Sequence, residues 1–422
     1  MALTLLHFAD LHLGVENHGS LDPSTGLHSR VQDFAFSLEA VFDLAIEKAV
    51  DLVLFAGDMY KNCDPTPTHQ RVLARQLQRL QAADIPIVLV VGNHDAPGAF
   101  GKATSVDIFS TLQLEGTYVI RRPELLRIET ANGPVQVAGL PWPTRHALLT
   151  RDEYRDLPLE EIRVAIQKIC AAQIDEYARQ LDPKLPSVLV AHLATADAVY
   201  SGGERTAIIG QDPVLLTSTL ANLAYDYVAL GHIHKYQDLN PGQHPPVVYS
   251  GSLERIDFGE EGEDKGFCLV RIAEDATAPR GRATTFEFVP VPARRFATIE
   301  LKVLDSQDAT ERIVAACAQA DLADAVVRVL YELPSGYATP VDLQQVRRAL
   351  ESAFHVASIQ PRFAPKDIQR RAEISEEAEL GDALDRYIDN IPDLQAHRSE
   401  LKNYALHLER ELESGQRDGD DG

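Results

Sequence analysis

The stretch Val91-Gly92-Asn93-His94-Asp95 places an amide, an imidazole and a carboxylate directly after an apolar run at residues 87–91. An unbroken run of β-branched and aliphatic residues is typical of a strand buried on both faces. Polar side chains that follow such a strand lie in the crevice beyond its carboxyl end, where α/β sheets place ligands. The stretch therefore predicts an α/β fold with a functional site at the end of this strand.

Four other apolar runs end in the same kinds of side chain. Asp10 and His12 follow residues 3–9, Asp58 follows 52–56, His192 follows 187–191, and His232 and His234 follow 227–230. Residues two apart in an extended segment point to one face, so we expect each of the two pairs to act together. Any one of these side chains could be a polar residue at the edge of the core with its hydrogen bonds made within the protein, but the whole set favours one shared site.

The rest of the chain predicts an α/β domain at residues 1–272, followed by smaller parts. Further strands are expected at 135–139, 247–249 and 267–272, with amphipathic helices at 33–49 and 68–82. Residues 273–295 resemble a hairpin and linker, because proline at alternate positions breaks a central strand. A small α/β domain at 296–366 reads as strand 296–304, helix 308–320, strand 325–333, helix 341–354 and strand 356–362. Residues 367–413 form charged amphipathic helices that pack on the preceding domain or bind a partner, and 414–422 is expected to be disordered.

Composition limits the class of protein. The 422 residues are 45% apolar and include four cysteines without a CxxC pair, which argues against a disulfide framework and a cysteine zinc site. No signal peptide and no apolar run of about 18 residues is evident, so we expect a cytoplasmic protein without a membrane span. The net charge of −23 counts against nucleic-acid binding. However, part of the acid lies in the last third of the chain, and bound divalent cations would make the local field positive.

The donor types indicate which ions the site would hold. Imidazole, carboxylate and amide oxygen without thiolate favour Mn²⁺, Zn²⁺ or Fe²⁺ over a purely oxygen-ligated Mg²⁺ or Ca²⁺. The candidate ligands are Asp10, His12, Asp58, Asn93, His192, His232 and His234. Seven ligands exceed the needs of one catalytic ion and suit two ions about 3.5–4 Å apart that share a carboxylate.

In this order, Asp-x-His, Gly-Asp, Gly-Asn-His-Asp, Ala-His and Gly-His-x-His resemble the motifs of calcineurin-like metallophosphoesterases. The resemblance implies a four-layer α/β/β/α sandwich. It assigns one ion to Asp10, His12, Asp58 and His234, and the other to Asp58, Asn93, His192 and His232. It also implies that His94, oriented by Asp95, stands over the scissile phosphate as a proton donor or transition-state stabiliser.

A later segment, Tyr249-Ser-Gly-Ser-Leu-Glu-Arg-Ile-Asp-Phe-Gly-Glu260, resembles the corresponding segment of SbcD-type DNA repair nucleases. That resemblance implies exonuclease action on duplex DNA ends and endonuclease action on single strands, with two divalent ions, most simply Mn²⁺. It also implies a capping domain, an SMC-like ATPase (SbcC-type) bound through the C-terminal helices, and a homodimer as a further expectation.

Contacts with substrate are less well marked. Arg30, Lys61, Ser252 and Arg255 are candidate phosphate contacts, although each also suits a structural or surface role. His18 and His28, in the loop at 15–29, are not expected to be ligands. Two alternatives stay open: a phosphoesterase for nucleotides, cyclic nucleotides or phosphoproteins, which the acidic pI favours, and a non-catalytic scaffold, which the complete ligand set disfavours.

Overall fold

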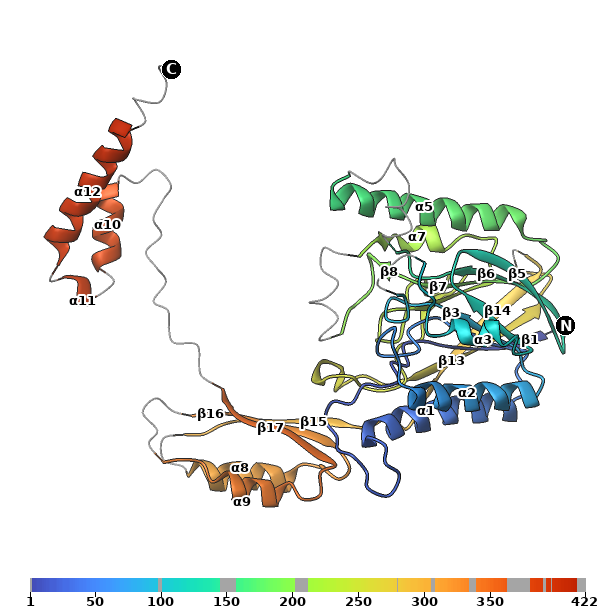
Figure 1. Ribbon diagram of the computed structural model, residues 1–422, viewed down its shortest axis with the longest axis horizontal. Helices are drawn as coiled ribbons and strands as arrows, with labels where there is room; N and C mark the ends of the chain where they lie inside the picture. The colour runs from blue at the N-terminus through green and yellow to red at the C-terminus, as the bar shows by residue number, and fades with distance from the viewer. Residues whose placement is uncertain are drawn as a thin grey trace. The chain divides into compact units, whose positions relative to one another are not determined.

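Two six-stranded sheets packed face to face form the core of the larger part of the protein (Figure 1). The structure is a computed structural model that describes residues 2–97, 101–144, 157–201, 212–278, 280–304, 308–333, 339–362, 380–389, 392–395 and 397–415. The first sheet has the order β14-β13-β1-β2-β3-β4 and the second the order β11-β12-β10-β7-β6-β5.

The strands of the first sheet are β1 (Ala2–Phe8), β2 (Leu52–Phe55), β3 (Ile87–Val90), β4 (Thr117–Ile120), β13 (Gly266–Glu274) and β14 (Arg282–Pro290). Those of the second sheet are β5 (Glu124–Thr130), β6 (Gly133–Leu140), β7 (Ser187–His192), β10 (Tyr227–Gly231), β11 (Gln237–Asp238) and β12 (Val247–Tyr249). The strands β8 (Ala194–Thr195) and β9 (Val214–Leu215) form a separate small pair.

Helices cover the outer face of each sheet and complete four layers. On the first sheet lie α1 (Ser29–Glu47) and α2 (Pro67–Ala82), and on the second lie α5 (Leu159–Gln180) and α7 (Thr217–Leu220) (Figure 1). In α1, Phe34, Leu38 and Val41 recur at helical spacing and are fully buried against the sheet. The expected α/β/β/α sandwich is confirmed.

Strand direction brings the polar motifs to one edge. The strands β1, β2, β3 and β4 run parallel, and so do β6, β7, β10 and β12. The carboxyl ends of β1, β2 and β3 therefore lie together, as do those of β7 and β10. Backbone hydrogen bonds from Asp10 N to Gly57 O and from His12 N to Asp58 O, both 3.0 Å, join the loops that follow β1 and β2.

The expected boundary at residue 272 falls inside β13. This strand pairs with β14 from Gly266 opposite Pro290 to Glu274 opposite Arg282, and β13 also pairs with β1. The first sheet therefore extends to Pro290, because its edge strand β14 lies within the segment expected to be a hairpin and linker.

The expected small α/β domain has its predicted order of elements: β15 (Phe296–Lys302), α8 (Ala309–Gln319), β16 (Val326–Glu332), α9 (Leu343–Ala349) and β17 (His355–Arg362). Its sheet has the order β15-β16-β17.

The C-terminal helices are α10 (Leu380–Asp389), α11 (Pro392–Gln395) and α12 (Arg398–Gly415). Ion pairs from Asp385 to Arg398 and Lys402 join α10 to α12. The disorder predicted for residues 414–422 is wrong for 414 and 415, which belong to α12, and residues 416–422 lie outside the described residues. Among the helices that the structure describes, none is long and apolar enough to cross a membrane.

Candidate metal centre

The seven predicted ligands converge at the carboxyl ends of the strands. Of these, six are buried, and Asn93 is half-buried. The exposed fraction of Asp10 and His192 is 0%. Such concentration of imidazole and carboxylate groups away from water is costly unless a bound ion or a partner compensates for it.

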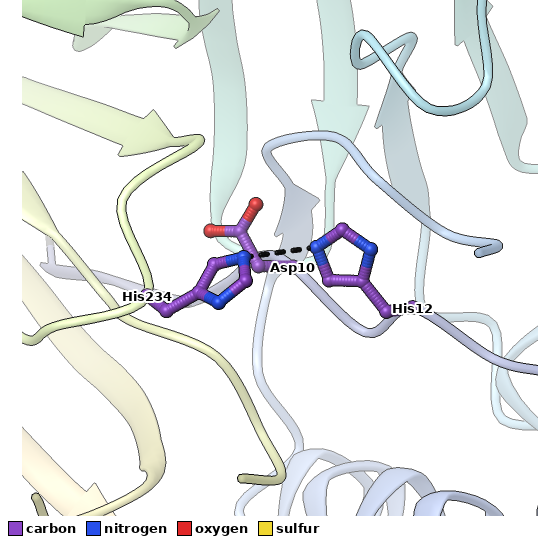
Figure 2. Close-up of side chains that lie close together, drawn as sticks. All are labelled: Asp10, His12 and His234. Carbon is purple, nitrogen blue, oxygen red and sulfur yellow. Dashed lines mark hydrogen bonds between the residues drawn. The ribbon is translucent and has the colours of Figure 1, made fainter. Parts of the chain in front are cut away.

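Asp10, His12 and His234 form the first cluster, which Figure 2 shows from close range. One ligand atom from each of the three lies within 4.8 Å of the others. His12 Nε2 lies 3.0 Å from His234 Nε2, so two imidazole nitrogens face each other (Figure 2). Two neutral imidazoles arranged this way share at most one proton, whereas a cation can bind a lone pair from each.

Asn93, His192 and His232 form the second cluster. The side-chain oxygen of Asn93 lies 2.9 Å from His192 Nε2 and 3.0 Å from His232 Nδ1. His192 Nδ1 donates to the carbonyl oxygen of Ala56 at 2.7 Å. A neutral His192 with its proton on Nδ1 presents the lone pair of Nε2 toward Asn93, which is the arrangement of a metal-ligating histidine.

Asp58 lies between the two clusters. Its Oδ2 is 3.6 Å from His12 Nε2 and 3.4 Å from His192 Nε2, and its Oδ1 accepts a hydrogen bond from His94 N at 2.9 Å. One carboxylate oxygen thus reaches toward a histidine of each cluster. This position suits a carboxylate shared by two ions.

The charges in the site also fit a bound cation. Burial raises the pKa of Asp10 to about 7, although His192 and His234 oppose this effect. For His192, burial favours the neutral form, but Asp58 and Asp10 outweigh it and raise the pKa to about 9. Without an ion, His192 therefore carries a proton that balances the buried carboxylates, and a divalent ion at this place would supply that positive charge instead.

Four non-glycine residues of the site have positive φ: Asp10 at 52°, His12 at 47°, Asp58 at 58° and His232 at 103°. The expectation that Asp10 and His12 share one face of an extended segment is therefore wrong, as it is for His232 and His234. The side chains meet because the loops turn through left-handed conformations that extended spacing does not describe. Such conformations cost roughly 1–3 kcal/mol each and are found at functional sites.

Glycine lets the loops approach one another closely. A Cβ added to Gly92 would lie 2.1 Å from Asp58 Oδ1 and 2.4 Å from Asp58 N. Because real Cβ contacts are longer than this, the loop after β3 can reach Asp58 only with glycine at this position.

Gly92→Ala is expected to lower the metal content and to reduce the free energy of unfolding by about 1–3 kcal/mol, because the new methyl group displaces Asp58. Elemental analysis and urea unfolding measure the two effects. Gly262→Ala is the matched control, since a Cβ there meets no atom within 4 Å. Equal metal content in both variants would contradict the close approach.

Asp95 does not orient His94, contrary to the expectation. Its buried carboxylate accepts hydrogen bonds from the backbone N–H groups of Asp58, Met59, Tyr60 and Gly92, at 2.9–3.2 Å. It therefore holds together the loops that follow β2 and β3. The ring of His94 is held instead by the carbonyl oxygen of Lys61, 2.7 Å from Nδ1.

His94 is exposed at the rim of the site. One of its ring nitrogens lies within 4.8 Å of ligand atoms of His12 and Asp58, and its ring packs edge-on against His12 at a centroid distance of 4.7 Å. The position places this imidazole beside the first cluster and within reach of a bound substrate.

Three of the four candidate phosphate contacts bond to other groups of the chain instead. Arg30 is completely buried and pairs with Asp33 and Glu254, because α1 packs against the segment that contains Glu254. Ser252 is also fully buried, and its hydroxyl donates to the carbonyl oxygen of Glu254.

Arg255 is half-buried, and its guanidinium nitrogens already donate to the carbonyl oxygens of Glu260, Glu263 and Arg294. The predicted substrate contacts at Arg30, Ser252 and Arg255 are therefore wrong. Lys61 is exposed and lines the cavity described below, so its role remains a prediction.

His18 and His28 lie outside the three groups that could hold a metal ion. His18 packs against Phe258 and Phe296, and His28 accepts a hydrogen bond from Arg30 N at the start of α1.

The sequence pattern missed two residues that shape the site. Trp142, the only tryptophan in the chain, lies against His232 with a centroid distance of 4.8 Å. It follows β6, whose carboxyl end reaches the same edge of the fold, so a search for side chains at the ends of strands could have found it.

Glu260 is the second missed residue. It accepts a hydrogen bond from His234 Nδ1 at 2.9 Å. Burial raises the pKa of Glu260, but His234 and Lys265 outweigh this effect and lower it to about 2.

A cavity of about 540 Å³ opens onto the centre. Its walls include His12, Asp58, Asn93, His94, His232 and His234. Among the described residues of its lining, Lys61 is the only lysine or arginine, while Glu16, Asp212 and Asp257 add carboxylates. The candidate ligands are open to the cavity, so a phosphate ester could enter it and bind to metal ions held by these ligands.

Fold and site together define a metal-dependent phosphoester hydrolase. The profile of the calcineurin-like phosphoesterases matches residues 3–236, and the chain belongs to this family. Enzymes of the family use divalent metal ions, and the side chains described here supply a fitting set of ligands.

Two curated relatives are similar over about two thirds of the chain. The uncharacterized metallophosphoesterase YhaO of Bacillus subtilis is 28% identical over 273 residues, which span 64% of this chain and 57% of that protein. The SbcD component of the nuclease SbcCD of Rhodobacter capsulatus is 29% identical over 289 residues, which span 66% of this chain and 68% of that protein. A solved dimetal phosphatase from Danio rerio aligns over 67% of this chain and 98% of its own, with 11% identity and a TM-score of 0.39.

Proposed function

We propose that this protein is the nuclease component of a DNA repair and recombination complex and hydrolyses DNA phosphodiester bonds at duplex ends and within single strands. The observation that carries the proposal is the arrangement of seven ligands in two clusters around Asp58, at the mouth of a cavity of about 540 Å³. The similarity to a component of the nuclease SbcCD over 66% of the chain supports DNA as the substrate.

In this proposal, Asp10, His12, Asp58 and His234 hold one ion, and Asp58, Asn93, His192 and His232 hold the other. Mixed imidazole and oxygen donors make Mn²⁺ the ion that we propose. When bound, a pair of such ions polarises the phosphodiester and makes water a better nucleophile.

The chain's own residues complete the site. His94 stands at the exposed rim, where it can donate a proton or a hydrogen bond to the phosphoryl group. Trp142 covers His232 from the side and limits the orientations of its ring. Lys61 provides a positive charge for a backbone phosphate.

The C-terminal helices are the proposed binding site for an SMC-like ATPase. Leu380, Tyr387, Tyr404 and Leu408 are large apolar side chains that α10 and α12 leave exposed, with 65% of Tyr404 accessible. Exposed apolar side chains gathered on a small helical unit are typical of a protein interface.

Deleting residues 367–422 is expected to abolish co-purification with the ATPase and leave metal content and hydrolysis of a small phosphodiester unchanged. The reason is that the described metal ligands all lie before this segment. Affinity co-purification and elemental analysis are the measurements. Undiminished capture of the ATPase would remove the assignment and favour helices that only pack within the chain.

Substrate class is tested by incubating the purified chain with Mn²⁺ and three substrates in parallel: linear duplex DNA, single-stranded DNA and a small phosphodiester. The proposal expects cleavage of both DNA substrates, with or without stimulation by the ATPase. Turnover of the small ester without DNA cleavage, even with the ATPase present, would favour a phosphoesterase for nucleotides or other small substrates.

A further inference from the structure

Glu260 forms a buried triad with His234 and Lys265. Glu260 lies at the end of the short helix η2 (Phe258–Glu260), and its Oε1 is 2.9 Å from His234 Nδ1. Its other oxygen, Oε2, is 2.8 Å from Lys265 Nζ. Only 2% of Glu260, 2% of Lys265 and 9% of His234 are exposed, so water screens these contacts weakly.

The contact defines which nitrogen of His234 can bind an ion. An ionised carboxylate only accepts hydrogen bonds, so the proton of a neutral His234 lies on Nδ1. Nε2 then carries the lone pair, and this is the atom that lies 3.0 Å from His12 Nε2. A carboxylate behind a ligating imidazole also increases its basicity and fixes the orientation of the ring.

Lys265 compensates for the burial of the Glu260 carboxylate. Its ammonium group contacts Glu260 and also donates to the carbonyl oxygen of His234 at 3.1 Å and to Glu263 at 3.0 Å. A buried carboxylate without such a partner would be strongly destabilising. The triad thus places a negative charge behind His234 and offsets the cost of burying it.

The backbone around Glu260 is held from several directions. Arg255 Nε donates to the Glu260 carbonyl oxygen at 3.2 Å, and Ile256 N donates to Oε2 at 3.2 Å. The next residue, Glu261, accepts a hydrogen bond from Thr298 N of β15 at 2.7 Å. Because these contacts fix the position of the Glu260 carboxylate, it can determine the orientation of the His234 ring.

We infer that Glu260 is a positioning residue for the metal centre: it fixes the tautomer and ring orientation of His234 and strengthens its bond to the ion shared with Asp10 and His12. This role rests on the proposed two-ion function. It also gives the segment from Tyr249 to Glu260 a part in the metal centre, although its Ser252 and Arg255 bond to backbone carbonyl oxygens of the chain.

The test is titration of the metal-free full-length protein with Mn²⁺ by calorimetry. Glu260→Ala is expected to lower the affinity of the protein for one of the two ions by about 10–100-fold, the usual effect of removing a hydrogen-bond partner of a metal ligand. The affinity for the other ion should stay unchanged. Glu260→Gln keeps an acceptor for Nδ1–H but loses the charge, so its loss should be smaller. The glutamine variant preserves shape and carries the test if the alanine variant fails to fold.

Glu263→Gln is the matched control. Glu263 also pairs with Lys265, and it accepts a hydrogen bond from Ser201 at 2.7 Å. We expect this variant to bind both ions with parental affinity. Parental affinity for both ions in Glu260→Gln, or an equal loss in Glu263→Gln, would overturn the inference. Failure of the parent protein to cleave DNA would instead refute the proposed substrate, since the metal titration does not depend on it.

Discussion

Asp58→Ala is expected to abolish phosphodiester hydrolysis and to lower the metal content of the purified protein from about two ions toward one or none. The carboxylate of Asp58 reaches toward His12 at 3.6 Å and His192 at 3.4 Å, so its removal takes a ligand from both clusters. Loss of a bridging ligand disrupts the pair of ions that an in-line displacement at phosphorus needs. Elemental analysis and an assay with a small phosphodiester measure the two effects.

Asp51→Ala provides the matched control for a buried acid. Asp51 is 2% exposed, directly precedes β2 and accepts a hydrogen bond from Thr4 N at 2.8 Å, whereas Asp58 follows the same strand. The control should be less stable to unfolding but retain its ions. Two tightly bound ions in Asp58→Ala would show that the bridging role is wrongly assigned.

His94→Ser is expected to reduce the rate of DNA hydrolysis by roughly 10²–10⁴-fold, which is the usual contribution of a positioned general acid. Both ions and DNA binding should be retained. The carbonyl oxygen of Lys61 accepts from Nδ1, so Nε2 is the atom that can exchange a proton with a substrate. Rate measurements at saturating DNA, with metal content determined on the same sample, make the test.

His192→Ser separates chemistry from metal binding. His192 is completely buried between Asn93 and Asp58, so its loss should remove metal and activity together. If His94→Ser also lacked an ion, or cleaved DNA at the parental rate, the division of roles between His94 and the ligands would be wrong.

The inner strands could be predicted from the sequence, whereas the edge strands could not. The strands β2 and β3 are fully buried and consist only of aliphatic and aromatic residues, so composition alone marks them. The edge strand β5 mixes exposed, half-buried and buried positions and includes two glutamates and an arginine, and the edge strand β4 has only four residues, so neither gives a comparable signal.

The residues of the site could be predicted, but their geometry could not. The order of polar residues after strands identified Asp10, Asp58 and His232, yet all three have positive φ. That conformation depends on contacts between loops far apart in the sequence, such as the hydrogen bond from His232 N to Asp10 Oδ1 at 3.0 Å. No local pattern records these contacts.

The errors at Arg30 and Asp95 have a similar origin. A basic residue near a motif predicts a phosphate contact only if it is exposed, and the burial of Arg30 depends on Glu254, more than 200 residues away. Asp95 directly follows His94, but adjacent side chains diverge, and its carboxylate turns to the backbone of the neighbouring loop.

The most direct test of the two-ion centre is electron paramagnetic resonance during titration of the metal-free protein with Mn²⁺. Two ions that share Asp58 should bind per chain and give the signal of an exchange-coupled pair, and in Asp58→Ala this signal should be replaced by that of isolated Mn²⁺ or lost. Saturation at one ion per chain, or two ions with only isolated signals in the parent protein, would contradict the account.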